Sequence, residues 1–370
     1  MLNRLGIPLP ILQAPMAGVS TPQLAAAVSN AGGLGAIGIG ATDVAGAKRM
    51  IEETRQATDH PFNVNVFTHA TPQPDLETER GWLAALRPLF AQFDAEPPAR
   101  LRTIYQSFND SPDLLRLLLD TRPAVVSFHF GLPAPQVITA MREAGITLLA
   151  TATNLEEARR VQDAGIDGIV AQGIEAGGHR GVFDCSAYDP QLGTFALTRL
   201  LARVMDIPVI AAGGIMDGAG IAAALALGAS AAQLGTAFID CPETDADAAY
   251  RQALHGAAAY GTRLTSAISG RPARVLENRF THAMEAGLTG KIPAYPVAYD
   301  AGKALHAAAK VKGEYGFGAY WAGQGAPLAR SRPAAELVAV LARELEAELA
   351  VFSSVFTSPA GTPRLGYGLR

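Results

Sequence analysis

The stretch IPVIAAGGIMDGAGIAAALALGASAAQLGT, residues 207–236, shows the structural pattern on which the chain is built. It starts with a short aliphatic run, Pro208–Ala212, and turns at Gly213-Gly214. Asp217 then suits the N-cap of an alanine-rich helix that ends at a glycine. A second aliphatic run, Ala231–Leu234, follows. Strands that are apolar throughout and alternate with helices predict a parallel sheet buried on both faces.

The same alternation repeats toward the N-terminus. Asp43 and Asn154 each stand at the start of a helical stretch that follows an aliphatic run. The six further strand candidates are Pro10–Met16, Leu34–Ile39, Phe62–Phe67, Ala124–Phe130, Ile146–Thr151 and Gly168–Ala171. Eight strand–helix units predict an α/β fold of the (β/α)₈ type, a TIM barrel, rather than an open doubly wound sheet.

Two segments interrupt this pattern. Residues 71–111 combine proline, charge and Trp82, and are longer than a simple connection, which predicts an insertion in the barrel. After the eighth strand, residues 241–370 exceed what one closing helix needs. We therefore expect residues 1–240 to form the barrel, and residues 241–370 to form a helical extension over its mouth that contributes to the substrate pocket.

Composition narrows the classes of function. The formal net charge is only −4 and no run of Lys or Arg stands out, which disfavours a nucleic-acid partner. Apolar runs are too short to span a membrane, so no membrane partner is expected. Two cysteines are too few for a disulfide framework, which indicates the cytoplasm, and no histidines show metal-ligand spacing, so no metal is expected.

Polar and glycine residues cluster where the predicted strands end, which is where barrel enzymes carry their working groups. Gly213-Gly214 and Gly235-Thr236 follow the last two strands, and such turns let backbone N–H groups approach a phosphate. The same glycines also suit ordinary turns that need a positive φ. Asn65, Gln172 and Gln233 would suit the pyrimidine edge of a flavin, or would be amides bonded to backbone or water inside the barrel.

The most distinctive segment is QGIEAGGHRG, residues 172–181, a glycine-rich loop that carries His179 out of the sixth strand. A neutral imidazole with a pKa of about 6.5 is a suitable general base for a carbon acid such as a nitroalkane. The alternative is a loop histidine that bonds a backbone carbonyl. His129 lies between two phenylalanines, which predicts a packed histidine with its hydrogen bonds satisfied.

These motifs together resemble the nitronate monooxygenases, formerly called 2-nitropropane dioxygenases, and in particular their class I. The EAGGHRG core of the loop is specific to this superfamily, whereas single glycine motifs are shared with other FMN barrels. The stretches that carry the resemblance are Pro10–Gly18, Asn63–Asn65, Gln172–Gly181, Ala211–Ile215, Gln233–Thr236 and, more loosely, Glu277–Phe280 with the region of Tyr295, Tyr299 and Lys303.

The resemblance implies a non-covalently bound FMN, with Met16 against the isoalloxazine ring and His179 facing the reactive side of the flavin. It also implies that Tyr295, Tyr299 and Lys303 line the substrate pocket, where Lys303 would complement an anion unless it is a surface lysine. The implied cofactor contacts are Met16, Asn65, Gln172, Gly177, Gly178, Gly213, Gly214, Gln233, Leu234, Gly235 and Thr236.

The implied reaction is the oxidation of alkyl nitronates, such as propionate 3-nitronate, by O₂ to a carbonyl compound and nitrite through a flavosemiquinone. Turnover of neutral nitroalkanes and a homodimeric assembly are left open. The alternatives are an FMN-dependent NAD(P)H reductase of the enoyl-acyl-carrier-protein reductase or quinone reductase type, a flavin-free isomerase or aldolase with a phosphate ligand, and a non-catalytic flavin-binding scaffold.

Overall fold

The computed structural model describes residues 1–357, with the side chains of residues 1–351. Its main sheet has eight parallel strands in the order β1-β9-β8-β6-β5-β4-β3-β2, and a bridge between Leu12 and Leu34 joins its two ends. The strands are β1 (Ile11–Gln13), β2 (Gly35–Gly38), β3 (Phe62–Phe67), β4 (Val125–His129), β5 (Thr147–Ala152), β6 (Gly168–Gln172), β8 (Val209–Ala212) and β9 (Ala231–Leu234). All eight coincide with the predicted strands, so the TIM-barrel prediction is confirmed.

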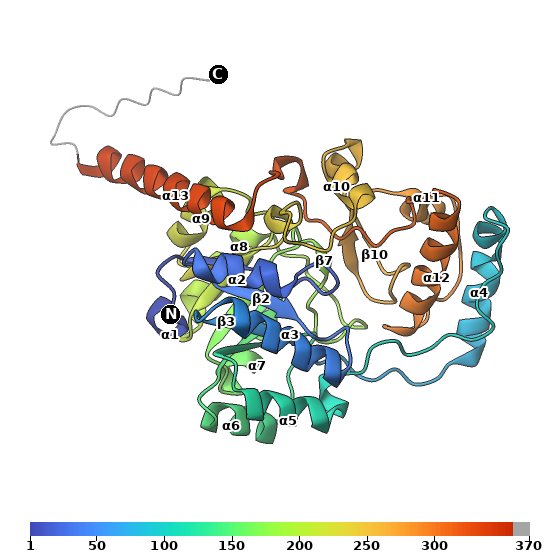
Figure 1. The fold of residues 1–370 in the computed structure, drawn as a ribbon, viewed down its shortest axis with the longest axis horizontal. Helices are drawn as coiled ribbons and strands as arrows, with labels where there is room; N and C mark the ends of the chain where they lie inside the picture. Colours follow the sequence, from blue (N-terminus) through green and yellow to red (C-terminus); the bar gives the residue numbers. More distant parts are fainter. Residues whose placement is uncertain (358–370) are drawn as a thin grey trace.

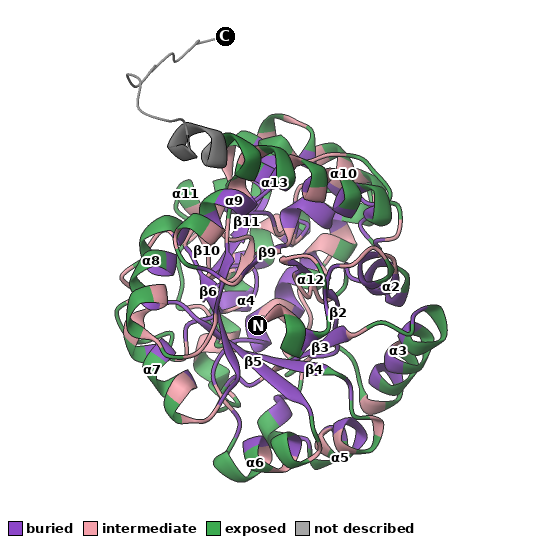
Figure 2. Ribbon diagram, turned by 90° about the vertical axis from the view of Figure 1, so that its left-hand side faces the viewer, coloured by how far each residue is buried: buried purple, intermediate pink, exposed green. Residues whose placement is uncertain are grey.

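A ring of helices surrounds the barrel (Figure 2). The predicted caps are present, since the carboxylates of Asp43 and Asp217 and the amide oxygen of Asn154 each accept a backbone N–H in the first turn of their helix. The ring helices are α2 (Pro22–Asn30), α3 (Val44–Ala57), α5 (Pro112–Thr121), α6 (Pro135–Glu143), α7 (Leu155–Asp163), α8 (Thr194–Val204), α9 (Gly218–Ala226) and α13 (Ala334–Thr357).

Helix α13 completes this ring after a long detour of the chain. It packs against α9 and α2, and Leu337, Leu341 and Leu345 are buried in the same core as Ile221 of α9. The predicted C-terminal extension is therefore present, but residues 241–333 lie between strand β9 and the barrel helix that follows it. Residues 358–370 of the predicted extension lie outside the described residues.

The opposite end of the barrel is closed by α1 (Leu2–Leu5), which lies at the centre of the ring in Figure 2. Leu5 and Ile7 are buried against the inward-facing strand residues Leu149 and Ile210. A salt bridge of 2.5 Å between Arg4 and the buried Asp167 ties this segment to the barrel. The N-terminal segment thus covers the end of the barrel at which its strands begin.

At the open end, the predicted insertion and residues 241–333 form one layer beside the barrel (Figure 1), which we call the cap. Trp82 and Phe90 of the insertion share a core with Phe280, Leu305 and Phe317. Its elements are α4 (Leu76–Ala91), α10 (Ala248–Leu254), α11 (Arg279–Glu285), α12 (Val297–Val311), β10 (Arg263–Thr265) and β11 (Ala273–Val275). Four 3₁₀ turns complete the described elements: Phe108–Asp110, Thr236–Phe238, Ala257–Gly261 and Ala326–Leu328.

A small antiparallel sheet joins the barrel to the cap. The glycine-rich loop after β6 forms a two-residue strand, β7 (Gly178–His179), that pairs with β11, so the sheet has the order β10-β11-β7. His179 is therefore held in a strand, whereas the sequence predicted a flexible loop. No helix within residues 1–357 is long and apolar enough to cross a bilayer.

Candidate active site

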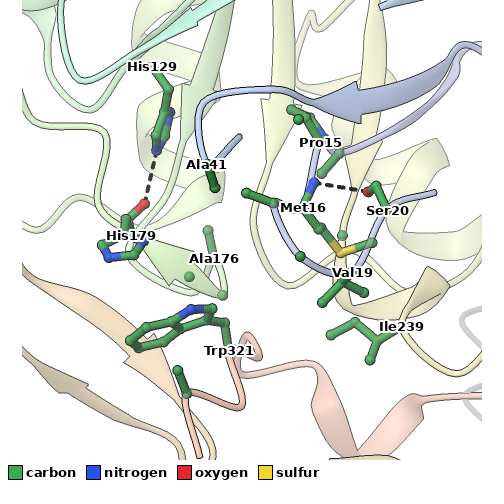
Figure 3. A pocket seen from close by; sticks show the side chains of 18 of the residues that line it. Pro15, Met16, Val19, Ser20, Ala41, His129, Ala176, His179, Ile239 and Trp321 are labelled. Atoms are coloured by element: carbon green, nitrogen blue, oxygen red, sulfur yellow. Dashed lines mark hydrogen bonds between the residues drawn. The ribbon is translucent and has the colours of Figure 1, made fainter. Parts of the chain in front are cut away.

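A cavity of about 640 Å³ lies where the carboxyl ends of the barrel strands meet the cap. Figure 3 shows that His179 and Trp321 face Met16 across it. The predicted site residues that line the cavity are Met16, Asn65, Gln172, Gly177, Gly178, His179, Gly213, Gly214, Gln233, Gly235, Thr236, Tyr295, Tyr299 and Lys303. Leu234, which was also predicted, does not line the cavity, because its side chain is buried in the core between the barrel and α13.

The imidazole of His179 is oriented by Ser269, a residue of the cap that was not predicted from the sequence. Its Nε2 lies 2.9 Å from Oγ of Ser269, and that oxygen lies 3.2 Å from the carbonyl oxygen of Arg271. A hydroxyl has one proton, which Ser269 donates to this carbonyl, so its oxygen accepts from Nε2–H of His179. This arrangement leaves Nδ1 of His179 as the nitrogen with a free lone pair.

Burial keeps His179 neutral. The pKa of His179 is lowered to about 3, mainly by removal of the imidazole from water and to a smaller extent by electrostatic repulsion from His129, Arg271 and His69. The sequence had suggested a pKa near the ordinary value of 6.5. The structure corrects this to a neutral imidazole that is a weaker base than expected.

Two neighbours hold the main chain of His179. Nε2 of Gln172 donates to the carbonyl oxygen of His179 at 3.0 Å, while its Oε1 accepts from the N–H of Gly181 at 2.7 Å. His129 contacts the same carbonyl at 3.2 Å and Oγ1 of Thr151 at 2.9 Å, as expected for a histidine with its hydrogen bonds satisfied. Gln172 therefore fixes the loop in addition to facing the cavity.

The glycine turns after β8 and β9 provide free backbone donors. Gly213 and Gly214 have φ values of 126° and 69°, which favour glycine. The N–H groups of Gly214 and Gly235 donate no hydrogen bond to any residue in 1–357. Donors left free at two adjacent turns beside a cavity fit an anionic group such as a phosphate.

The polar side chains near these turns use only part of their hydrogen-bonding capacity within the protein. Nδ2 of Asn65 donates to Oγ of Ser127 at 2.9 Å, which leaves its Oδ1 as an acceptor. The amide of Gln233 has no hydrogen-bond partner among the described residues, although it lines the cavity. These two amides therefore retain donors and acceptors that suit a heterocycle with alternating donors and acceptors.

Aromatic side chains from the cap form the other wall of the cavity. The ring centres of Tyr295 and Trp321 lie 5.2 Å and 5.0 Å from that of His179. The ammonium of Lys303 lies 5.2 Å from the ring centres of both Tyr105 and Tyr299, and it forms no ion pair with a described residue. Tyr105 belongs to the insertion, and neither it nor Trp321 was predicted, because only the folded chain brings them to the site.

The fold and the cavity define a class of protein, a TIM-barrel enzyme with a pocket lined by glycine turns and a half-buried histidine at the open end of the barrel. The chain matches the family model described as nitronate monooxygenase over residues 1–344. It belongs to this family and is an enzyme with that activity.

Individual relatives agree with this placement. The chain is 63% identical to the nitronate monooxygenase of Paraburkholderia phytofirmans, over 94% of either chain, and 57% identical to that of Pseudomonas aeruginosa, over 92% of this chain and 97% of the relative. It is also similar to the structure of a nitroalkane oxidase from Streptomyces ansochromogenes, with a TM-score of 0.86 and 44% identity, covering 95% and 99% of the two chains. The structure of FabK from Thermotoga maritima is less similar, with a TM-score of 0.71 and 30% identity over 95% and 97%.

Proposed function

We propose that this enzyme binds FMN and oxidises alkyl nitronates, with O₂ as second substrate, to a carbonyl compound and nitrite. The family to which it belongs is flavin-dependent. The observation that carries the proposal is the cavity, which has free N–H donors of glycine turns at one side and a neutral histidine with an aromatic wall at the other. Propionate 3-nitronate is the substrate that we propose as the first to test.

The residues of the barrel fit FMN. Gly213, Gly214, Gly235 and Thr236 would hold its phosphate, with Gly177 and Gly178 close by, because the N–H groups of Gly214 and Gly235 are free and a Cβ at Gly213 would lie 2.5 Å from Oγ1 of Thr194. Asn65, Gln172 and Gln233 would face the pyrimidine edge of the ring system, and Met16 would flank the ring. When bound, FMN supplies the acceptor for the electrons that leave the nitronate.

His179 would act on the substrate through Nδ1. The bond from Nε2–H to Ser269 fixes this tautomer, so Nδ1 can accept a proton from a neutral nitroalkane. The pKa of about 3 makes it a poor proton acceptor at neutral pH. We therefore infer that nitronates, which are already deprotonated, are used more efficiently than neutral nitroalkanes.

Lys303, Tyr295 and Tyr299 would bind the anion on the cap side. The hydroxyl of Tyr295 is buried beside the cavity and has no hydrogen-bond partner among the described residues, so it is free to donate to a substrate oxygen. Lys303 adds a positive charge at the exposed edge of the cavity. These groups come from the cap, which we therefore propose contributes the substrate side of the pocket.

An anaerobic absorbance spectrum of the purified protein, recorded before and after addition of propionate 3-nitronate, tests this function. We expect a bound-flavin spectrum that nitronate reduces. A flavin spectrum that nitronate leaves unchanged but NADH bleaches would instead identify an NAD(P)H reductase. A colourless protein that does not take up FMN would refute the cofactor assignment.

The compartment and the oligomeric state are two further points of the proposal. Cys185 and Cys241 are both free thiols, in keeping with the cytoplasm as the compartment that we propose. Light scattering of the purified protein would decide between a monomer and the homodimer that the sequence left open.

A further inference from the structure

Arg271 is a buried cation without a counter-ion. The residue is 5% exposed, and its guanidinium donates only to main-chain carbonyls, those of Arg180 and Val182. No carboxylate among the described side chains forms a salt bridge with it. The equally buried Arg180, in contrast, is paired with Asp189 at 2.9 Å.

The acidic groups near Arg271 already form other hydrogen bonds or are neutral. The Cys185 thiol and the Tyr295 hydroxyl act on Arg271 most, but burial raises the pKa of both groups and keeps them neutral. The carboxylates of Glu157 and Asp184 act on it at longer range. Glu157, however, accepts bonds from Thr153 and Phe183, and Asp184 accepts bonds from Ser186. A buried charge that is not paired is destabilising. Something other than these carboxylates must therefore balance Arg271.

Arg271 lies directly behind the cavity wall. Its guanidinium carbon is 4.2 Å from the ring centre of Phe130, and that ring is 5.7 Å from the ring of His179. Phe130 lines the cavity and has a φ of 80°, a left-handed conformation that is strained for a bulky residue and is concentrated at functional sites. The phenyl ring thus separates the cation from the cavity while transmitting its field through a medium of low polarity.

We propose that Arg271 is a positioning residue whose uncompensated charge, acting through Phe130, favours an anionic ligand beside His179 and opposes protonation of its imidazole. The identity of this anion as a nitronate rests on the proposed function, whereas the effect on His179 does not. The main-chain carbonyl of Arg271 also accepts a hydrogen bond from the hydroxyl of Ser269, so one residue supports both the charge state and the tautomer of His179.

Titratable groups face His179 from every element packed around it. β4 contributes His129, the segment after β3 contributes His69, and α12 with the turn before it contributes Tyr299 and Tyr295. The exposed Lys303 lies at the cavity edge. Of the groups that lower the pKa of His179 after burial, Arg271 is the one with a permanent charge, because the histidines titrate.

The test is a titration of His179 by NMR in the FMN-loaded protein with ¹⁵N-labelled histidine. Arg271→Gln removes the charge but retains donors for the carbonyls, and we expect it to raise the pKa of His179 by about one unit. Arg271→Lys keeps the charge and should leave this pKa close to the wild-type value. Arg274→Gln is the matched control, since Arg274 of β11 also donates to a main-chain carbonyl, that of Ile174, but does not lie over Phe130. An unchanged pKa in Arg271→Gln, or an equal shift in Arg271→Lys, would overturn the proposal.

Binding of inorganic nitrite, measured anaerobically by flavin absorbance, provides a second readout. We expect Arg271→Gln to raise the dissociation constant of this anion roughly tenfold while leaving that of neutral nitroethane unchanged. Equal weakening of both ligands would indicate a structural role and refute the proposal. If Arg271→Gln does not fold, Arg271→Met serves in both experiments. A shifted His179 titration in a protein that nitronate does not reduce would disprove the proposed function but not the role of Arg271.

Discussion

Ser269 is the residue whose role in the site is least visible in the sequence. It is fully buried, and its hydroxyl is the only partner of the His179 imidazole that fixes a tautomer among the described side chains. Ser269→Ala would remove this acceptor, and the imidazole would lose its preference for the form with a free Nδ1. We expect kcat with nitroethane to fall roughly tenfold, because residues that orient a catalytic imidazole contribute on this scale.

The same variant should turn over ethyl nitronate at close to the wild-type rate, because a nitronate needs no deprotonation. Steady-state rates with the neutral and the anionic form of one compound provide this comparison. An equal loss with both forms would show that Ser269 supports the structure of the site rather than the proton acceptor.

A substitution of Gly214, also at the scale of single residues, tests the proposed phosphate site. Its φ of 69° disfavours other residues by about 1–2 kcal/mol, and an added Cβ would lie 3.3 Å from that of Glu175. We expect Gly214→Val to weaken FMN binding by tenfold or more, measured by flavin fluorescence during dilution. Gly81→Ala is the control, because a Cβ at Gly81 meets no atom within 4 Å and Gly81 lies in α4, away from the cavity. Unchanged retention of flavin in Gly214→Val would place the phosphate elsewhere.

At the scale of elements, α4 shows how the insertion takes part in the site. Trp82 is fully buried against the cap, whereas Leu76 at the start of the same helix is 63% exposed. Trp82→Ala should destabilise the protein by about 3–5 kcal/mol and displace the segment that carries Tyr105, which raises KM for the nitronate. Leu76→Ala should alter neither quantity. Urea unfolding and steady-state kinetics of both variants test this, and an unaffected KM in a destabilised Trp82→Ala would mean that Tyr105 does not depend on α4.

The elements also show which parts of the fold the sequence could predict. The barrel strands and the helices that begin at Asp43, Asn154 and Asp217 were predicted correctly, because strand length, apolarity and capping are local properties. The pairing of β7 with β11 was not predicted, since it joins residues 178–179 to residues 273–274. For the same reason the sequence indicated the glycine turns and His179, but not Ser269.

At the scale of the whole molecule, the barrel and the cap make different contributions to one cavity. The barrel supplies the glycine turns and amides that fit a cofactor, and the cap supplies the aromatic wall, Lys303 and the Ser269–Arg271 support of His179. The return of α13 to the barrel anchors the end of residues 241–333 beside β9, where they begin. Both ends of this part of the cap are therefore attached to the barrel, which favours a fixed wall over a mobile lid.

The histidines around the cavity make the whole fold sensitive to acid. Burial, the largest cause in each case, lowers the pKa of His69 and His129 to about 4 and that of His179 to about 3. The unfolded chain binds these protons below pH 6.5, whereas the folded protein does not bind them until pH 3–4. The stability from these histidines is thus complete above pH 6.5 and is lost as the pH falls from 6.5 toward 4, by about 1.4 kcal/mol per pH unit for each histidine.

We expect the unfolding free energy of the protein without FMN, measured in urea, to fall by several kcal/mol between pH 7 and pH 5. His129→Gln removes one of the three groups, so the decrease should become about one third smaller, although the variant starts from a lower stability at pH 7. His60→Gln changes a histidine that is exposed in the folded protein, and its profile should match that of the wild type. A wild-type free energy that stays constant over this range would show that the three imidazoles take up protons in the folded state, and would thereby contradict the neutral form of His179 on which its role as a proton acceptor depends.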